Sequence, residues 1–386
     1  MENLNLTVSH LPSLTWNRLG VNKAQVTAEA KEGAPAVFTL RGGAGMAAGE
    51  IGAADADRQL AAVAVPDRRE AFVAGKTAIY QEQGFSTGLG AEFSDYMRKN
   101  APVVRTVSVA PGAKLTEPAV LTWDFGRGGS DAARQLITVG DGAEATVLLV
   151  YRSDAEAEGI SAVETDVLIG RDATLHLMKV NLLGTGFTHL DDTGAVIGDA
   201  GTLDFLQMEM GGARNWAGCY ADERGKGANL KIRTGYAVNA DHRLDLNYVA
   251  GQFGRKTVSA IDVKGVLADR AVKIFRGTID FRNGSAGSVG DEQEDVLLLD
   301  EDVINKTVPV ILCEEEDVDG RHGASIGRLS EDILFYLATR GIGEKEAQRL
   351  MLRGRLAGIA RAIPDEETVK LIDAAIDRYG SDGESD

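Results

Sequence analysis

The chain has 386 residues, of which 44% are hydrophobic, so it is long enough to fold into two or three structural regions. Its 58 acidic residues outnumber 41 basic ones, and the net charge of -17 argues against nucleic acid or an anionic membrane as a partner. The 46 glycines and an aromatic content of only 6% favour a turn-rich β architecture with small or branched core residues.

Cysteine content and the N-terminus predict the compartment. Cys219 and Cys313 are too few for a structural zinc site or a disulfide scaffold. The first residues lack the basic and apolar runs of a signal peptide, and no apolar stretch of about 18 residues predicts a membrane span. We therefore expect a protein of the reducing cytoplasm without membrane contact.

Residues 1–115 have a mixed pattern and are predicted to form an N-terminal α/β cap region. Pro12 to Asn17 reads as a loop that leads into a short ordered segment. Residues 70–74 and 91–99 are compatible with helices, and in the second of these Phe93 and Met97 fall on one side.

Residues 116–322 carry short, alternating apolar runs that predict strands. These runs cover residues 120–125, 146–151, 173–180 and 202–206. Several of them follow similar glycine turns, whose first glycines are Gly140, Gly170, Gly198 and Gly225, spaced by 30, 28 and 27 residues.

A turn that feeds a strand at nearly constant spacing is typical of stacked coils, in which each coil buries its inward face against its neighbours. The spacing favours a β-helix, also called a β-solenoid. An ordinary β-sandwich with glycine turns is the alternative, although its strands would return every 8–12 residues or so.

Residues 323–379 change to a helical period. We expect helices from Ser330 to Arg340, from Glu344 to Arg361 and from Asp365 to Arg378, with Gly341 ending the first. The second helix has an apolar stripe that comprises Ala347, Leu350, Leu356 and Ile359, and the third has one that comprises Val369, Ile372 and Ile376. The helices form either an end cap or a docking module, and residues 380–386 are predicted to be a disordered tail.

Motifs of common enzymes are missing from the sequence. It contains no phosphate-binding Gly-x-x-x-x-Gly-Lys-Ser/Thr loop, no Gly-x-Ser-x-Gly elbow, no His-Glu-x-x-His helix and no Cys-x-x-Cys pair. We therefore expect no ATP bound by this chain. Acidic pairs such as Asp191 and Asp192 are weak evidence for glycoside hydrolysis in a chain this acidic.

One block places a thiol, several carboxylates and an imidazole close together between the strands and the helices. It runs from Cys313 to His322 and reads Cys-Glu-Glu-Glu-Asp-Val-Asp-Gly-Arg-His. Imidazole, thiolate and carboxylate can all hold iron. We interpret Cys313 as a buried strand residue, whereas His322 either ligates iron or fixes a turn.

A set of motifs begins at the Phe275-Arg-Gly-Thr-Ile-Asp-Phe run and continues through Glu294-Asp-Val-Leu-Leu-Leu-Asp and Val308-Pro-Val-Ile-Leu-Cys. It ends with His322-Gly-Ala-Ser-Ile-Gly and Leu334-Phe-Tyr-Leu-Ala-Thr-Arg-Gly. In these motifs the C-terminal third resembles the SufB/SufD family of iron–sulfur cluster assembly scaffolds. The central repeats agree with the β-helix core of that family, and the N-terminal part matches loosely.

The resemblance implies a mainly β protein with a right-handed parallel β-helix core between the N-terminal α/β region and the C-terminal helical region. It also implies a non-catalytic scaffold that pairs with a SufB-like subunit and docks the SufC ATPase. The docking residues would include Leu334, Phe335, Tyr336, Leu337 and Arg340. Iron or a nascent cluster would be held transiently where the two cores meet.

His322 is similar in position to the histidine of SufD-like members, which implies that it is a ligand of iron or of the cluster. SufB-like members carry a cysteine nineteen residues earlier, where this chain has Val303, and a glutamate after the histidine, where it has Gly323. Both departures indicate a SufD-like chain. The alternatives are a homodimeric member that serves as both subunits and a β-helix enzyme that acts on acidic polysaccharide.

Overall fold

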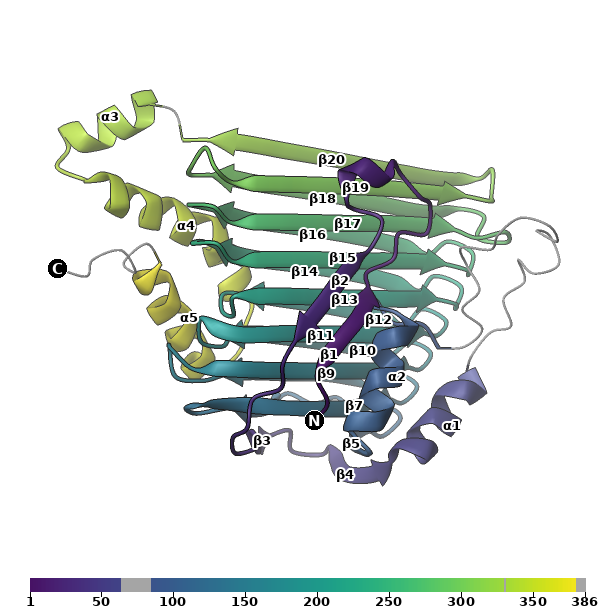
Figure 1. Ribbon diagram of the computed structural model, residues 1–386. Helices are drawn as coiled ribbons and strands as arrows, with labels where there is room; N and C mark the ends of the chain where they lie inside the picture. The colour runs from purple at the N-terminus through teal and green to yellow at the C-terminus, as the bar shows by residue number, and fades with distance from the viewer. Residues whose placement is uncertain (64–84, 330, 380–386) are drawn as a thin grey trace.

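The computed structural model describes residues 1–63, 85–329 and 331–379. Its main body is a parallel β-solenoid, in which two nine-stranded sheets face each other and each coil adds one strand to each sheet (Figure 1). We call the two sheets even and odd, after the numbers of their strands from β5 onward. The even sheet comprises β6 (Ala119–Asp124), β8 (Glu144–Arg152), β10 (Thr174–Leu182), β12 (Thr202–Glu209), β14 (Asn229–Val238), β16 (Val258–Leu267), β18 (Ser288–Leu298), β20 (Val318–Arg328) and β3 (Val37–Gly42). The odd sheet comprises β5 (Val103–Val109), β7 (Gly128–Val139), β9 (Glu158–Ile169), β11 (Gly186–Ile197), β13 (Arg214–Glu223), β15 (Arg243–Gln252), β17 (Val272–Phe281), β19 (Ile304–Cys313) and β4 (Ala47–Gly52).

The register between neighbouring coils stacks side chains of the same kind. Leu177 on β10 lies between Val147 on β8 and Phe205 on β12, and all three belong to the core between the two sheets. Because side chains alternate between the two faces of a strand, every second residue enters this interior. The four strand runs predicted from the sequence are confirmed as β6, β8, β10 and β12.

The glycine turns stack along one side of the solenoid, as predicted. The amide of Gly170 donates to the carbonyl of Val139, and the amide of Gly198 donates to that of Ile169. A Cβ atom on Gly170 would lie 2.8 Å from the backbone nitrogen of Asp141 in the coil below, so this turn requires glycine. The coil repeat is confirmed and the β-sandwich is not, because strands β5 to β20 pair with one another only in parallel along the described chain.

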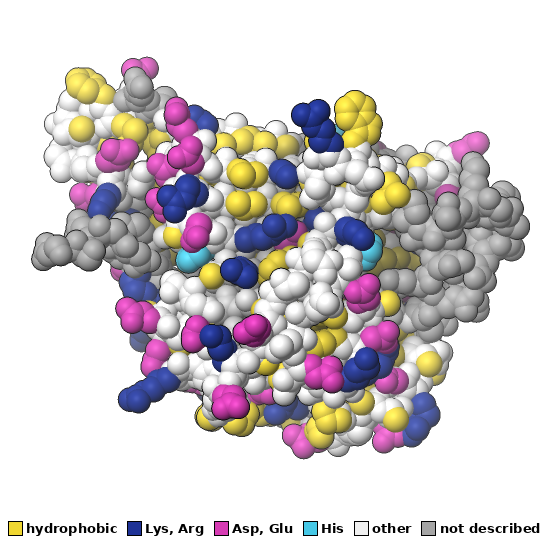
Figure 2. Space-filling view, in the orientation of Figure 1, with side chains coloured by type: hydrophobic (Ala, Val, Ile, Leu, Met, Phe, Trp, Pro, Cys, Tyr) yellow, Lys and Arg dark blue, Asp and Glu magenta, His cyan; other side chains and the backbone are white. Residues whose placement is uncertain are grey.

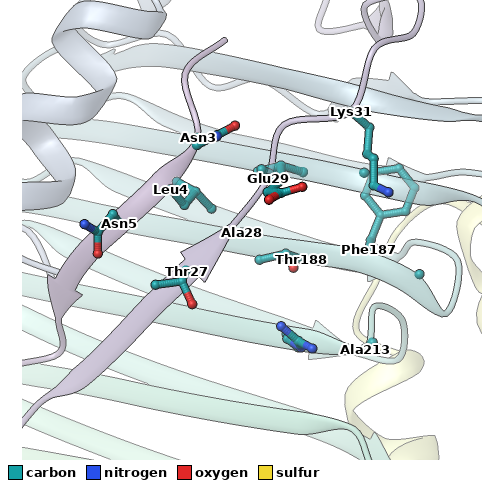
Figure 3. Close-up of a pocket in the computed structure, with 14 residues that line it drawn as sticks. Asn3, Leu4, Asn5, Thr27, Ala28, Glu29, Lys31, Phe187, Thr188 and Ala213 are labelled. Carbon is teal, nitrogen blue, oxygen red and sulfur yellow. The ribbon is translucent and has the colours of Figure 1, made fainter.

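The N-terminal region closes the first coil and covers one face. The strands β3 and β4 pair antiparallel with β6 and β5, and the hairpin of β1 (Leu4–Val8) and β2 (Ala24–Ala28) crosses the odd sheet (Figures 1 and 3). The remaining elements are η1 (Asn17–Leu19), α1 (Ala53–Val63) and α2 (Ala91–Asn100). The predicted helix at 91–99 is confirmed as α2, α1 was not predicted, and residues 70–74 lie outside the described part.

The hairpin and α2 are held by apolar contacts on the outer face of the odd sheet. Val8 and Val26 of the hairpin and Phe93 of α2 are buried in one cluster with Leu190 and Trp216 of the sheet. Beside this cluster, the hairpin and the turns of the sheet line a pocket that Figure 3 shows. The α/β cap region therefore covers the flank of the solenoid as well as its first coil.

Three C-terminal helices follow the last coil: α3 (Glu331–Thr339), α4 (Glu344–Ala360) and α5 (Glu366–Arg378). The outer face of the even sheet packs against α4 and α5 through a cluster that includes Met208, Leu356 and Ile372. Gly341 ends α3 with a φ of 79°, as expected of a C′ glycine. None of the described helices is long and apolar enough to cross a membrane.

The predicted stripe of α4 was wrong at one position. Leu350 is 48% exposed, whereas Leu352, which the prediction left out, is fully buried against the even sheet. Which positions of the helix are buried depends on the angle at which it crosses the sheet, and periodicity alone does not give that angle. The stripe predicted for α5 agrees with the structure, because Ile372 and Ile376 are buried and Val369 is partly buried.

The two ends of the solenoid differ. At the first coil β3 and β4 cover the edges, but β19 and β20 each have a neighbour on one side only among the described strands. Side chains of this last coil are accordingly half-buried or exposed, and Ile304 and Ile326 are 48% and 52% exposed. We call the surface formed by β19 and β20 the open end.

Candidate site at the open end of the solenoid

His322 lies on β20 and is exposed at the open end. It pairs in register with Glu292 on β18, whose side chain is buried in the interior of the coil below. Because facing positions of parallel strands point the same way, His322 continues the interior column of Ile232, Ile261 and Glu292, one residue from each coil, beyond the last covered coil. The predicted iron ligand is therefore accessible from outside.

Beneath His322 lies a buried group of charged and polar side chains. Lys273 on β17 forms an ion pair with Glu294 on β18, across the interior of the solenoid. The hydroxyl of Thr307 on β19 donates to the second oxygen of Glu294 at 2.5 Å. Glu294 is thus satisfied on both oxygens, and its position is fixed.

Glu292 has a different environment, although it lies only two residues from Glu294. Burial, reinforced by the charge of Glu294, raises the pKa of Glu292 to about 8, and Lys273 opposes this only in part. Its carboxyl sits over Gly277, where a Cβ atom would lie 2.2 Å from Oε2. The open end therefore holds a proton-bearing carboxyl directly below an exposed imidazole.

This arrangement can supply an imidazole and a carboxylate to a metal, but it is incomplete by itself. Iron in proteins takes more ligands than one histidine and one buried carboxyl provide. Ligands that complete such a site must come from a molecule placed against the open end.

The structure corrects the interpretation of Cys313. It ends β19 as a strand residue, but it is exposed, and its thiol donates to the carbonyl of Glu315 at 3.0 Å. Cys313 stacks over Phe281 of the coil below and has no described coil above it, which is why the prediction of burial was wrong. Val303 directly precedes β19 and packs partly buried against the interior core.

The residues predicted to contact a partner lie on α3 and directly after it. Leu334 and Leu337 are half-buried, while Phe335 and Tyr336 are 73% and 56% exposed. The guanidinium of Arg340 lies 5.1 Å from the centre of the Tyr336 ring. Figure 2 shows hydrophobic side chains over this helix, which stands off the solenoid beside β20 (Figure 1).

A second polar group in the middle of the solenoid was not predicted. His189 and Asp191 on β11 and Glu209 on β12 are buried and bring one possible ligand atom each to within 4.8 Å of one another. The signal in the sequence was a histidine and an aspartate two residues apart, which fall on the same face of a strand. The glutamate comes from the opposite sheet, and no local pattern indicates it.

The Asp191 and Asp192 pair does not form an exposed pair of carboxylates. Asp191 faces the interior, where it contacts Lys179, while Asp192 accepts from the amide of Leu89 under the N-terminal cap. Both are 1% exposed or less. Neighbouring residues of a strand point to opposite faces, so these two carboxyls cannot act together on a sugar.

The fold and the open end define a class of protein: a β-solenoid whose last coil leaves strand edges free to pair with another chain. A family model described as the SufBD core domain of the SUF system for iron–sulfur cluster assembly matches residues 125–355. This match covers more than half of the chain. The chain belongs to the SufBD family of iron–sulfur cluster assembly proteins.

Among its relatives, the chain is 26% identical over 245 residues to the iron–sulfur cluster assembly protein SufD of Bacillus subtilis, which spans 63% of this chain and 56% of that protein. It is 25% identical over 297 residues to SufD of Escherichia coli, spanning 74% of this chain and 69% of that one. A SufBD family protein of Mycobacterium tuberculosis is 34% identical over 115 residues, 30% of this chain and 14% of that protein. The chain thus matches little more than half of the Bacillus relative.

Proposed function

We propose that this chain is a SufD-like, non-catalytic scaffold subunit of a SufBCD-type complex. It pairs with a SufB-like subunit through the open end and docks a SufC-type ATPase through its C-terminal helices. The SufD names of two relatives and the valine at position 303 support the SufD-like assignment. A valine carries no sulfur, so the thiolate of the site comes from the partner.

The observation that carries the proposal is the exposed His322 on a strand with one free edge, above a buried carboxyl. A second solenoid seated on β19 and β20 would continue both sheets and bury this imidazole at the junction. His322 then holds iron or the nascent cluster as a neutral imidazole. The iron is cargo that passes through the site, and ATP is hydrolysed by the partner.

The C-terminal region, residues 323–379, supports the second contact. Two of its helices already bury their apolar faces on the even sheet, but α3 leaves Phe335 and Tyr336 exposed. Aromatic side chains with a nearby arginine are enriched at protein interfaces. We therefore assign Leu334, Phe335, Tyr336, Leu337 and Arg340 to the ATPase contact.

The test is co-expression of the chain with SufB-like and SufC-like subunits, followed by anaerobic purification and measurement of subunit stoichiometry, iron and sulfide. We expect His322→Ala to assemble the complex normally and to lose most of its iron and sulfide. An assembled His322→Ala complex with unchanged iron and sulfide would refute the ligand role.

Two control variants sharpen this test. His176→Ala removes a half-buried histidine on the outer face, which is hydrogen-bonded to Asp204, and it should leave iron and sulfide unchanged. Cys313→Ser removes the one exposed thiol of the described chain. It should also have no effect, because the partner supplies the thiolate, whereas loss of sulfide would favour a homodimer that uses its own cysteine.

A further inference from the structure

The buried group of His189, Asp191 and Glu209 lies between the two sheets, far from the open end. Glu209 is on β12, four strands before β20 in the even sheet, which is roughly 19 Å at the usual strand spacing. The three side chains are 0%, 1% and 2% exposed. The group is therefore separate from the site proposed at His322.

His189 is the unexplained member of this group. Neither ring nitrogen makes a hydrogen bond of normal geometry to any described residue, although the side chain is fully buried. The backbone of Ser161 lies close to the imidazole, and the centroids of the Tyr151 and His189 rings are 5.0 Å apart. The Ser161 backbone can partner only one of the two ring nitrogens, and a buried polar atom without a partner is costly. An imidazole in this position, beside two carboxylates, is suited to ligate a metal ion.

The two carboxylates are held in place by a surrounding set of donors. Lys179 donates to Asp191 at 2.5 Å. Gln207 and Asn181 donate to the two oxygens of Glu209, each at 2.8 Å. Such outer contacts fix the direction of metal ligands, because each carboxylate oxygen keeps a further lone pair for an ion.

Charge and access also suit a cation. Two carboxylates face one ammonium, so the fully ionised group carries a net negative charge that a cation can offset. A pocket of about 760 Å³ between α5 and the coil turns is lined by Glu209 and by Asn215, whose side chain accepts a hydrogen bond from Asn181. The pocket thus reaches the side of the group on which Glu209 lies.

We propose that His189, Asp191 and Glu209 form a binding site for one divalent first-row transition-metal ion of the Fe²⁺ or Mn²⁺ type. One imidazole and two carboxylates are the donor set that such ions accept, and the lack of a thiolate disfavours softer metals. This site goes beyond the proposed scaffold function, because it needs neither a partner subunit nor His322.

The experiment uses the full chain, purified anaerobically and stripped of metal. Fe²⁺ is added by equilibrium dialysis and counted by elemental analysis, and Co²⁺ in a parallel sample reports the ligand set by its visible spectrum. We expect one tightly held ion in the wild type. Glu209→Gln and His189→Asn should each weaken binding at least tenfold and alter the cobalt spectrum.

Two controls separate this site from other histidines. His176→Asn and His322→Ala should both retain the ion, and retention in His322→Ala makes the result independent of the scaffold proposal. Unchanged affinity and spectrum in folded Glu209→Gln and His189→Asn would overturn the site, and so would a wild type that holds no ion. If His189→Asn fails to fold, Glu209→Gln decides, because it keeps the size of the side chain and gives up only one of the two hydrogen bonds that Glu209 accepts.

Discussion

His322 and Glu292 are thirty residues apart in the sequence and lie side by side on β20 and β18. This interval is one coil of the solenoid, so the exposed imidazole at the end sits over a carboxyl that the preceding coil has already buried. At the last coil, a position that is buried in the coils below is therefore exposed to solvent. Under the proposed function, a partner that continues the interior column of His322 would also supply the remaining ligands of the site.

The first prediction concerns this docking surface. Ile326 lies on the same face of β20 as His322, stacks over Val296 and is 52% exposed. Ile326→Lys should leave the isolated chain folded, because surface substitutions cost about 0.5 kcal/mol or less. It should weaken pairing with a SufB-like subunit at least tenfold, since the lysine would be buried unpaired in the complex.

Analytical ultracentrifugation of mixed subunits measures this effect. Val258→Lys is the matched control, because Val258 is also a β-branched strand residue and is 43% exposed, but it lies on β16 two strands away from the end. If both lysine variants bound the SufB-like subunit equally well, the interface would not include the exposed face of β20.

The second prediction concerns α3. Phe335→Asp should abolish co-purification of the ATPase while the thermal midpoint of the chain changes little, since the Phe335 side chain is 73% exposed. Trp16→Asp replaces another exposed aromatic, at 82%, on the N-terminal loop, and it should leave the ATPase bound. If the ATPase still co-purified with the Phe335→Asp variant, the exposed face of α3 would not be its binding surface.

The solenoid was predictable because its signal is repeated. Gly140, Gly170 and Gly198 recur at one-coil intervals, and each turn must avoid the backbone of the turn below. In contrast, α1 is preceded by Gly52 and not by one of the stronger capping residues Ser, Thr, Asp or Asn, and the sequence predicts burial of Cys313 because its strand has the same pattern as the others. Cys313 is exposed because no further coil stacks on β19, and the residue pattern of a strand does not show whether another coil will cover it.

The two candidate sites also differ in how far the sequence predicts them. His322 stands within a specific motif, so the resemblance indicated it directly. The pairing of His189 with Glu209 joins two facing sheets, and Lys273 with Glu294 does the same nearer the end. Contacts across the interior depend on which inward positions meet, and neither spacing nor composition determines that.

The third prediction tests the corrected face of α4. Leu356 is fully buried against the even sheet and Leu350 is 48% exposed. Leu356→Ala should lower the free energy of unfolding by about 2–5 kcal/mol, through lost apolar burial and the cavity left behind. Leu350→Ala should cost less than about 1 kcal/mol. Chemical unfolding followed by circular dichroism measures both, and similar losses would contradict the assigned face.

The last prediction concerns pH. Glu223, at the end of β13, is fully buried, and burial raises the pKa of its carboxyl well above the ordinary value of 4.5, while Gln252 opposes this shift. Above about pH 4.5 the unfolded chain loses a proton that the folded chain keeps. This group therefore makes stability fall as pH rises, by up to about 1.4 kcal/mol per pH unit, until the folded pKa is reached.

Glu223→Gln keeps the shape of the side chain but has no proton to lose. The variant should match the wild type near pH 4 and become progressively more stable than it between about pH 5 and pH 7. Urea midpoints across this range measure the difference, and Glu117→Gln, at an exposed position, is the control that should follow the wild type. Parallel curves for the Glu223 variant and the wild type would mean that the folded chain holds this carboxylate ionised, because a buried acid that keeps its proton must lose stability as the unfolded chain releases it.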